Sequence, residues 1–463
     1  MKKDYPETDE FFTQDNDNEI EAQTSLPSQP QTDGRKKSSV FWKRFGAVAL
    51  AVGMFGAGYF ASEVQYDEGL RTLKRIKNQI QNHYYEEVTD ERFYDVLFDA
   101  VNNDLLDRYS SYMTPDEYQS VLSDATGEWS GLGITFLTED AQGKKQLLVQ
   151  RVSGNSPAEA VGVKEGDYVI GYGMDENSIV LCEEYEQFYA FVQERSKEEN
   201  FLLKIRRNGQ ESFLEICKKT FIENYVFYRS STTAYAFAGK DGTELVERGD
   251  PLASLDEKTA YIRLTHFNGN ADEEFKFAME KFKEEGKTNL VLDLRSNGGG
   301  YMSILQEISS YFCKGENGSS LIAVAKYREG QKEKFYSKGS YYDKYFQENS
   351  KIKVLADPST ASASECLIGC MLDYGAITYA DICLSERNGV AKTYGKGIMQ
   401  STYPFGLLGD VDAIKLTTAQ IYWPKSENCI HGRGILPEDG TKTVEENYEK
   451  DAEIASAIAK LFN

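Results

Sequence analysis

The run of small residues from Ser359 to Ser364 is the stretch of this sequence whose surroundings best suit a serine nucleophile. Ser362 belongs to a run of small residues between a strand-like segment that ends near Ala356 and a helix-like segment that begins with the Ser/Ala run. The free N–H groups at such a helix N-terminus favour developing negative charge, and small side chains let a reacting carbonyl approach. Lys396 lies between two glycines, and a lysine that burial keeps neutral can act as a base. A serine of this run is therefore a candidate nucleophile, and Lys396 is a residue of interest downstream of it.

Other groups nearby remain alternatives. Ser359 and Ser364 could be the nucleophile instead of Ser362. His431 is the histidine near this stretch and would allow a histidine-based triad. Lys396 could also be a solvated lysine in a glycine loop. It does not belong to a phosphate-binding loop, because no Ser or Thr follows it.

Two glycine-rich turns are further candidates for function. The turn Arg295-Ser-Asn-Gly-Gly-Gly300 follows a buried-strand pattern at 289–294, and active sites favour the carboxyl ends of such strands. In Gly131-Leu-Gly-Ile134, the glycines let successive backbone N–H groups converge on one point, which suits a terminal carboxylate. The strand that follows would offer an open edge to which a peptide adds as an extra strand. A β domain with a tight glycine turn and no ligand is the alternative.

Hydrophobic periodicity predicts the elements around the turn Gly131–Ile134. Residues 66–122 carry apolar side chains at helical spacing, and Thr114 is placed to cap a helix that begins at Pro115. Residues 128–218 show β-strand patterns separated by Gly and Asn turns, with one helix at 183–195.

After about residue 219 the chain alternates strand and helix patterns, as in α/β proteins. Strands are expected at 260–265 and 289–294, and helices at 271–285 and 302–312. The polar stretches 327–351 and 381–393 are expected to be loops or insertions, to which we assign no function.

The first 62 residues have a different character. Residues 1–40 are polar with few aliphatic side chains, which predicts a disordered tail. Residues 41–62 contain an uncharged stretch that approaches the ~20 residues needed to cross a bilayer. Basic residues precede this stretch and acidic residues follow it, so a single-pass anchor in the cell membrane with a cytoplasmic N-terminus and an extracytoplasmic body is expected. A cleaved signal peptide is the alternative, although the polar region before the apolar stretch is long for one.

Composition excludes several classes of protein. The 74 acidic residues exceed the 52 basic ones, for a net charge of −22, so nucleic acid is not an expected partner. The three histidines and seven cysteines show no zinc-binding or thioredoxin-like spacing, so neither a metal nor another cofactor is expected. Cys366 and Cys370 are interpreted as small core residues, with a metal or redox pair as the alternative.

Together, four sets of residues resemble the carboxyl-terminal processing (tail-specific) serine peptidases. They are Ser362-Ala-Ser-Glu365, Gly395-Lys-Gly-Ile-Met-Gln400, the turn that ends at Gly300, and a pair of PDZ-like motifs, Gly131-Leu-Gly-Ile134 and 156–170. The resemblance extends from residue 66 to about 460. It implies an α/β peptidase core of the Clp-protease/crotonase-like type together with a PDZ domain.

The resemblance also implies roles for individual residues. Ser362 would be the nucleophile, Lys396 the general base, and Gln400 the residue that holds the lysine in place. The oxyanion hole would be formed by the amide of Ala363 and by that of Gly298 or Gly299. The carboxylate-binding loop of the PDZ domain would consist of Gly131, Leu132, Gly133 and Ile134.

Two features depart from the family pattern. The interval between Ser362 and Lys396 is longer by about nine residues, so the loop around 381–392 must bulge without displacing the lysine. In the family, the arginine that couples the PDZ domain to the peptidase is followed by two spaced glycines. Arg195 is the candidate here, but Ser196 and Glu199 follow it, which makes that role doubtful.

The sequence therefore predicts a membrane-anchored, extracytoplasmic serine endopeptidase of α/β (α+β multidomain) fold that binds proteins or peptides with apolar C-termini. The alternative is a catalytically inactive PDZ scaffold. Apolar faces on the helix near 70–84 and on the C-terminal helix predict a homodimer. The expected parts are a tail (1–40), an anchor (41–62), a helical segment (63–127), a PDZ domain (128–218) and a peptidase domain with a C-terminal helix (219–463).

Overall fold

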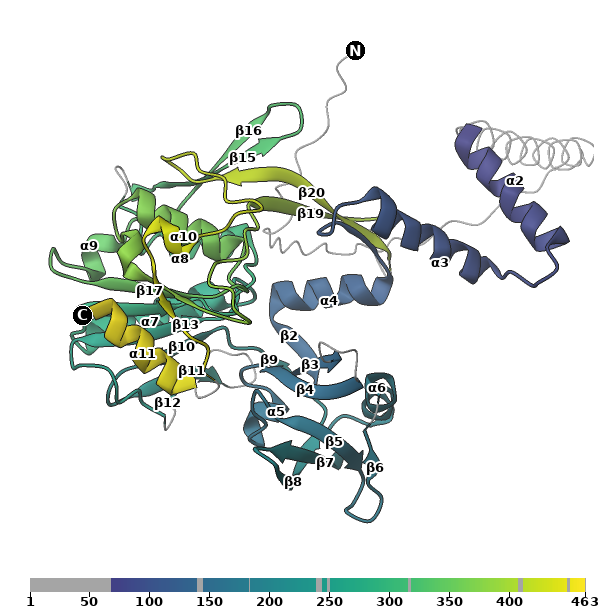
Figure 1. Cartoon of the computed structure of the whole chain (residues 1–463), viewed down its shortest axis with the longest axis horizontal. Coiled ribbons are helices and arrows are strands. Elements are labelled where there is room, and N and C mark those ends of the chain that lie inside the picture. The colour runs from purple at the N-terminus through teal and green to yellow at the C-terminus, as the bar shows by residue number, and fades with distance from the viewer. Residues whose placement is uncertain are drawn as a thin grey trace, which may run out of the picture. The chain divides into compact units, whose positions relative to one another are not determined.

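A computed structural model describes the chain from residue 68 onward in two compact units, one ending at Phe93 and one beginning at Tyr94 (Figure 1). The predicted tail (1–40) and anchor (41–62) lie outside the described residues. In the part that is described, none of the helices combines the length and apolar character needed to cross a membrane. The described ranges are 68–139, 145–182, 184–238, 244–247, 250–314, 318–406, 411–447 and 450–462.

The first unit contains α2 (Glu68–His83) and the start of α3 (Asp90–Ala100), both predicted as helical. Lys77 pairs with Asp90 at 3.0 Å, and Gln81 Nε2 donates to Asp90 Oδ1 at 2.6 Å. No residue of α2 is buried, and Leu70 and Ile76 are about half exposed. The apolar face that motivated the dimer prediction is therefore exposed within its unit.

In the second unit, α4 (Pro115–Thr126) follows a short π-helix (Val101–Leu105) and β1 (Ser111–Met113). Thr114 caps α4 as predicted, because its hydroxyl accepts from the amide of Glu117 and the Glu117 carboxylate accepts from the amide of Thr114. The helix ends at Gly127, whose φ of 72° is left-handed.

Residues 128–222 form an antiparallel β structure with its own hydrophobic core. The six-stranded sheet has the order β3-β4-β5-β7-β8, with β6 on β5, so β3 is an edge strand. Buried side chains alternate along β4 and β7 and pack against α6, which confirms the predicted strands and helix. β2 (Glu128–Gly131) pairs with β9 (Lys219–Ile222) and joins the two ends of the segment. The other elements are β3 (Ile134–Glu139), β4 (Lys145–Val152), α5 (Pro157–Ala160), β5 (Tyr168–Gly173), β6 (Val180–Leu181), α6 (Tyr185–Glu194), β7 (Asn200–Arg207) and β8 (Gln210–Cys217).

The remaining chain is built on an eight-stranded sheet of order β12-β11-β10-β13-β14-β17-β18-β21, parallel from β13 to β21. Its central strands are almost fully buried, which explains their continuous apolar sequence. The strands are β10 (Val226–Arg229), β11 (Ala234–Ala238), β12 (Glu244–Glu247), β13 (Thr259–Leu264), β14 (Asn289–Asp293), β17 (Ile352–Ala356), β18 (Ile382–Ser385) and β21 (Lys442–Val444).

Helices cover both faces of this sheet (Figure 1). One face packs on α7 (Ala271–Glu284), α8 (Met302–Ser309) and α10 (Ala363–Asp373). The other face, through alternate residues such as Val291 and Leu355, packs on α11 (Lys450–Phe462). The apolar face of the C-terminal helix is thus buried within its own chain. The expectation that this face seeks a partner in a dimer is wrong.

A second sheet, of order β1-β20-β15-β16 with β19 on β20, projects beside α10 (Figure 1). One strand of this sheet, β16, lies in the predicted loop 327–351, which also contains the helix α9. The predicted loop 381–393 begins with β18 of the main sheet. β16 was missed because it is a charged edge strand, and β18 because it has four residues. The new elements here are β15 (Leu321–Tyr327), β16 (Lys332–Tyr336), α9 (Tyr342–Tyr345), β19 (Ile398–Pro404), β20 (Ala413–Tyr422) and two 3₁₀ turns, Tyr379–Asp381 and Pro437–Asp439.

Candidate active site

Two adjacent parallel strands, β14 and β17, deliver the glycine turn and the Ser362 turn to the same edge of the main sheet. Asn297 joins these turns. Its side chain donates to the carbonyl of Leu264 at 2.8 Å and accepts from the amide of Gly299 at 2.9 Å. Its own carbonyl accepts from the amide of Ala361 at 2.9 Å. The position of the serine turn is therefore fixed by the glycine turn.

Ser362 immediately precedes α10 and has a φ of 58° and a ψ of −115°. Positive φ is uncommon for a residue with a side chain, and such strained residues cluster at active sites. Gly299 has a φ of 104°, and a Cβ there would lie 2.7 Å from the Cβ of Ser362. Only glycine fits beside the serine at this point.

The amides proposed for the oxyanion hole differ in their hydrogen bonds. The N–H of Ala363 is the first of α10, so it has no acceptor within the helix. The N–H of Gly299 already donates to Asn297 Oδ1. Gly298 is therefore the better candidate of the two glycines.

Glu365 links the serine turn to the lysine loop. Its fully buried carboxylate accepts from the hydroxyl of Thr393 at 2.5 Å and from the amides of Gly395 at 2.8 Å, Lys396 at 2.9 Å and Ser362 at 3.1 Å. Burial raises the pKa of this carboxyl, and the four hydrogen bonds oppose that rise. The sequence contains a signal for this role of Glu365, because the spacing S-x-x-E is typical of a capping box.

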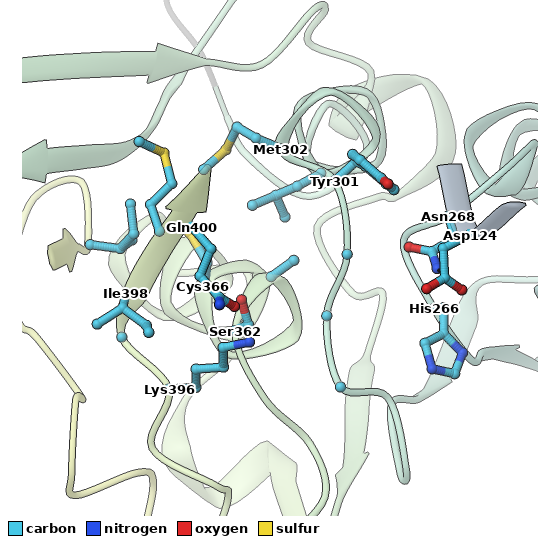
Figure 2. Close-up of a pocket in the computed structure, with 18 of the residues that line it drawn as sticks. Asp124, His266, Asn268, Tyr301, Met302, Ser362, Cys366, Lys396, Ile398 and Gln400 are labelled. Atoms are coloured by element: carbon cyan, nitrogen blue, oxygen red, sulfur yellow. The ribbon is translucent and has the colours of Figure 1, made fainter. Parts of the chain in front are cut away.

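Lys396 and Gln400 both line a cavity of about 560 Å³ together with Ser362 (Figure 2). Among the described residues, no hydrogen bond joins the lysine amine to the serine hydroxyl. The amine lies 5.5 Å from the ring centre of Tyr109. Gln400 Nε2 donates to the backbone carbonyl of Tyr109, and not to Lys396. The structure thus brings the three predicted residues into one cavity. The lysine lies beside the ring of Tyr109, and the glutamine bonds the backbone of the same residue.

The electrostatic environment of Lys396 favours its neutral form. Burial lowers the pKa of its amine, and the positive charge of Lys415 lowers it further. Asp107 and Glu365 act in the opposite direction, but the net shift is downward. A lysine with a lowered pKa can accept a proton closer to neutral pH.

A second set of polar side chains lies at another part of the cavity (Figure 2). Asn268 Nδ2 lies 3.4 Å from Asp124 Oδ1, and His266 is beside them. Burial raises the pKa of Asp124 to about 6 and lowers that of His266 to about 4. Sequence reasoning missed these residues and Lys415, because they come from α4, from the segment after β13 and from β20 and share no local motif.

The alternatives for the nucleophile and the base lie elsewhere. Ser364 is buried and donates to the carbonyl of Asn297, and Ser359 is exposed outside the cavity. His431 is exposed and is not among the cavity-lining residues. Within the described part of the chain, no cluster of three or more metal-ligating side chains is found.

The predicted carboxylate-binding loop lines a separate cavity of about 290 Å³ between the edge strand β3 and α6. Gly133 has a φ of 76°, and a Cβ there would lie 2.2 Å from the Cβ of Ser156. The carbonyls of Leu132 and Gly133 accept from the amides of Ala158 and Ser153. The apolar wall of the cavity includes Leu132, Ile134, Phe136, Phe188 and Val192.

Arg195 lies away from the catalytic cavity. Its guanidinium is 4.7 Å from the ring centre of Phe191, 3.6 Å from Glu199 and 3.4 Å from Met174 Sδ. All these partners belong to the 128–218 segment, so the structure brings Arg195 to none of the peptidase residues.

Comparison with known proteins identifies the class. Residues 258–439 match peptidase family S41, a region that includes Ser362 and Lys396. The region that carries the candidate site is therefore that of an S41 serine peptidase, and the chain is similar to the carboxyl-terminal processing proteases.

Three relatives carry names of this kind. The chain is 25% identical over 449 residues to a probable CtpA-like serine protease of Staphylococcus haemolyticus (93% of this chain, 79% of the relative). It is 25% identical over 382 residues to the carboxy-terminal processing protease CtpB of Bacillus subtilis (81% and 68%). It is 26% identical over 349 residues to a carboxyl-terminal-processing protease of Synechocystis (75% and 70%).

Proposed function

We propose that Ser362 and Lys396 form the catalytic pair of this peptidase. The serine Oγ attacks the peptide carbonyl carbon while the neutral lysine amine takes the hydroxyl proton. The resulting oxyanion accepts hydrogen bonds from the amides of Ala363 and Gly298. Collapse of the intermediate breaks the C–N bond, and the lysine returns the proton to the leaving amine. Water then hydrolyses the acyl-enzyme, with the lysine again as base.

The observation that carries this proposal is the shared cavity of Ser362 and Lys396, with the positive φ of the serine and the lowered pKa of the lysine. Gln400 supports the lysine indirectly in this proposal, because it bonds the backbone of Tyr109, whose ring lies beside the lysine amine.

We further propose that residues 128–218 act as a PDZ domain that selects substrates by an apolar C-terminus. The glycine loop would receive the terminal carboxylate, and the substrate would extend the sheet at β3 with its last side chain in the adjacent apolar cavity. Residues 41–62 would anchor the chain in the membrane, with the peptidase outside the cytoplasm. A homodimer through the exposed face of α2 belongs to the same proposal.

The test is cleavage of an unstructured protein such as casein by the full chain in detergent. Cleavage is expected in the presence of a chelator and is expected to be lost in Ser362→Ala. Absence of cleavage by the unaltered chain, with tail binding intact, would favour the inactive scaffold instead.

A further inference from the structure

A second lysine, Lys415, lines the catalytic cavity together with Lys396. It lies on β20, opposite Thr402 of β19 on one side and Ser111 of β1 on the other. In the described part of the chain, Lys415 forms no ion pair with a carboxylate. A partly buried positive charge without a bonded counter-charge acts on whatever ionisable group shares its cavity.

The sheet fixes Lys415 relative to the catalytic loop. The chain runs from Lys396 directly into β19, which pairs with β20 from Ile398 to Pro404. On the other side of β20, the amide of Thr417 donates to Ser110 Oγ at 2.8 Å. Neither lysine backbone can move away from the other without breaking this pairing.

The acidic groups that face Lys396 are largely engaged. Glu365, on α10, accepts four hydrogen bonds, which engage both of its carboxylate oxygens. Asp107, before β1, is bonded to Ser110 and Thr417. Asp124, on α4, interacts electrostatically with Lys415 itself. Lys415 is the charged group with the largest effect on the pKa of Lys396, and Asp107 and Glu365 oppose it.

We propose that Lys415 is a positioning residue for the peptidase reaction, whose ammonium group on β20 repels a proton from the amine of Lys396 and so keeps that amine free to accept the proton of Ser362. This inference rests on the proposed catalytic pair. In this role Lys415 does not contact the reacting atoms. It acts through Lys396, because one cationic group can activate a neighbouring lysine.

The first test is the pH dependence of kcat/KM for casein-derived peptides. Lys415→Met should move the acidic limb to higher pH, so that activity on that limb falls about tenfold while the alkaline plateau changes less than about twofold. Lys415→Arg keeps the positive charge and should leave the acidic limb at the pH at which the unaltered enzyme shows it. Lys334→Met removes a charge from exposed β16 in the same sheet and should leave the limb in place.

Salt gives a second prediction of the same proposal. Raising the ionic strength screens the cavity charges, so the limb of the unaltered enzyme should move toward that of Lys415→Met. A raised KM at every pH with an unmoved limb would place Lys415 in substrate binding and overturn the proposal.

A measurement independent of turnover separates this inference from the proposed mechanism. In the Ser362→Ala chain, competitive acetylation of Lys396 by acetic anhydride, read by peptide mass spectrometry, reports its titration directly. The titration should move to higher pH when Lys415→Met is added and return with Lys415→Arg. If it stays unchanged, the inference is wrong even if the catalytic pair is right. If it moves while the unaltered chain cleaves nothing, the catalytic proposal fails and the coupling of the lysines stands.

Discussion

Glu365 is the residue on which the geometry of the candidate site most depends, because one buried carboxylate orders both the serine turn and the lysine loop. Each oxygen accepts two hydrogen bonds: Oε1 from Thr393 and Gly395, and Oε2 from Ser362 and Lys396. An amide in its place can accept at one oxygen only.

Glu365→Gln should therefore leave two buried donors facing an NH₂ group. We expect a loss of about 2 to 6 kcal/mol in the free energy of unfolding, because each of the two unsatisfied buried donors costs about 1–3 kcal/mol. Turnover should fall by more than tenfold, since the serine and the lysine lose their common support. Urea denaturation and peptide cleavage measure the two effects. Glu280→Gln, on the exposed face of α7, is the control and should change neither.

Lys396 carries the clearest prediction about chemistry. Activity should rise with pH as its amine loses a proton, and the limb should lie below the range of an exposed lysine because burial and Lys415 lower its pKa. Lys396→Arg should reduce turnover by several orders of magnitude, since a guanidinium stays protonated. His431→Ala should stay within about twofold of the unaltered chain. A collapse of the histidine variant would return a histidine-based triad to consideration.

At the scale of elements, the loop before β3 makes the tail-binding proposal testable. Gly133→Ala adds a methyl group at a φ of 76° and 2.2 Å from Ser156 Cβ, so the loop must shift. Affinity for a labelled peptide with an apolar C-terminus, measured by fluorescence polarisation, should fall at least tenfold. Gly162→Ala is matched in backbone strain, with a φ of 81°, but has open space around the added methyl group. Its affinity should be unchanged. Equal losses in both variants would count against the loop.

The elements also explain which parts of the fold could be predicted from the sequence. Ser362 was found because a buried strand, small residues and a helix follow each other directly along the chain. β16 was missed because an exposed edge strand carries charges where alternation is expected. Asp124, His266 and Lys415 could not be predicted as neighbours, because only tertiary packing brings their three segments together.

At the scale of the whole molecule, a buried ionic network ties α11 to the main sheet. Glu453 pairs with Arg295 at 2.6 Å and with Arg387 at 2.9 Å and accepts from the hydroxyl of Ser385 at 2.7 Å. Burial alone would raise the pKa of Glu453, but its hydrogen bonds with Arg387, Ser385 and Asn447 outweigh burial and lower it to about 2. The network therefore stabilises the fold only while this carboxyl is ionised.

This network predicts an acid dependence of stability. A carboxyl group whose pKa is lowered in the folded state stabilises the fold at pH values above the ordinary pKa of Glu. This stabilisation is lost as the pH falls toward 2. At pH 7, Glu453→Gln should lower the free energy of unfolding by about 3 kcal/mol, because buried arginines lose their partner. The difference from the unaltered chain should shrink as pH falls, in urea titrations at pH 7 and pH 3. A difference that is constant with pH would contradict this account. Glu348→Gln, at an exposed position, is the control.

The pairing of β1 with β20 sets the order in which the enzyme can be completed. Residues 111–113 pair with 413–415, and Gln400 bonds the backbone of Tyr109. The chain is made from its N-terminus. β1 therefore has no β20 to pair with until nearly nine-tenths of the length of the chain has left the ribosome. During that time the part of the cavity that Lys396 and Lys415 line is not yet formed. The peptidase is thereby kept inactive while its own chain is still being made.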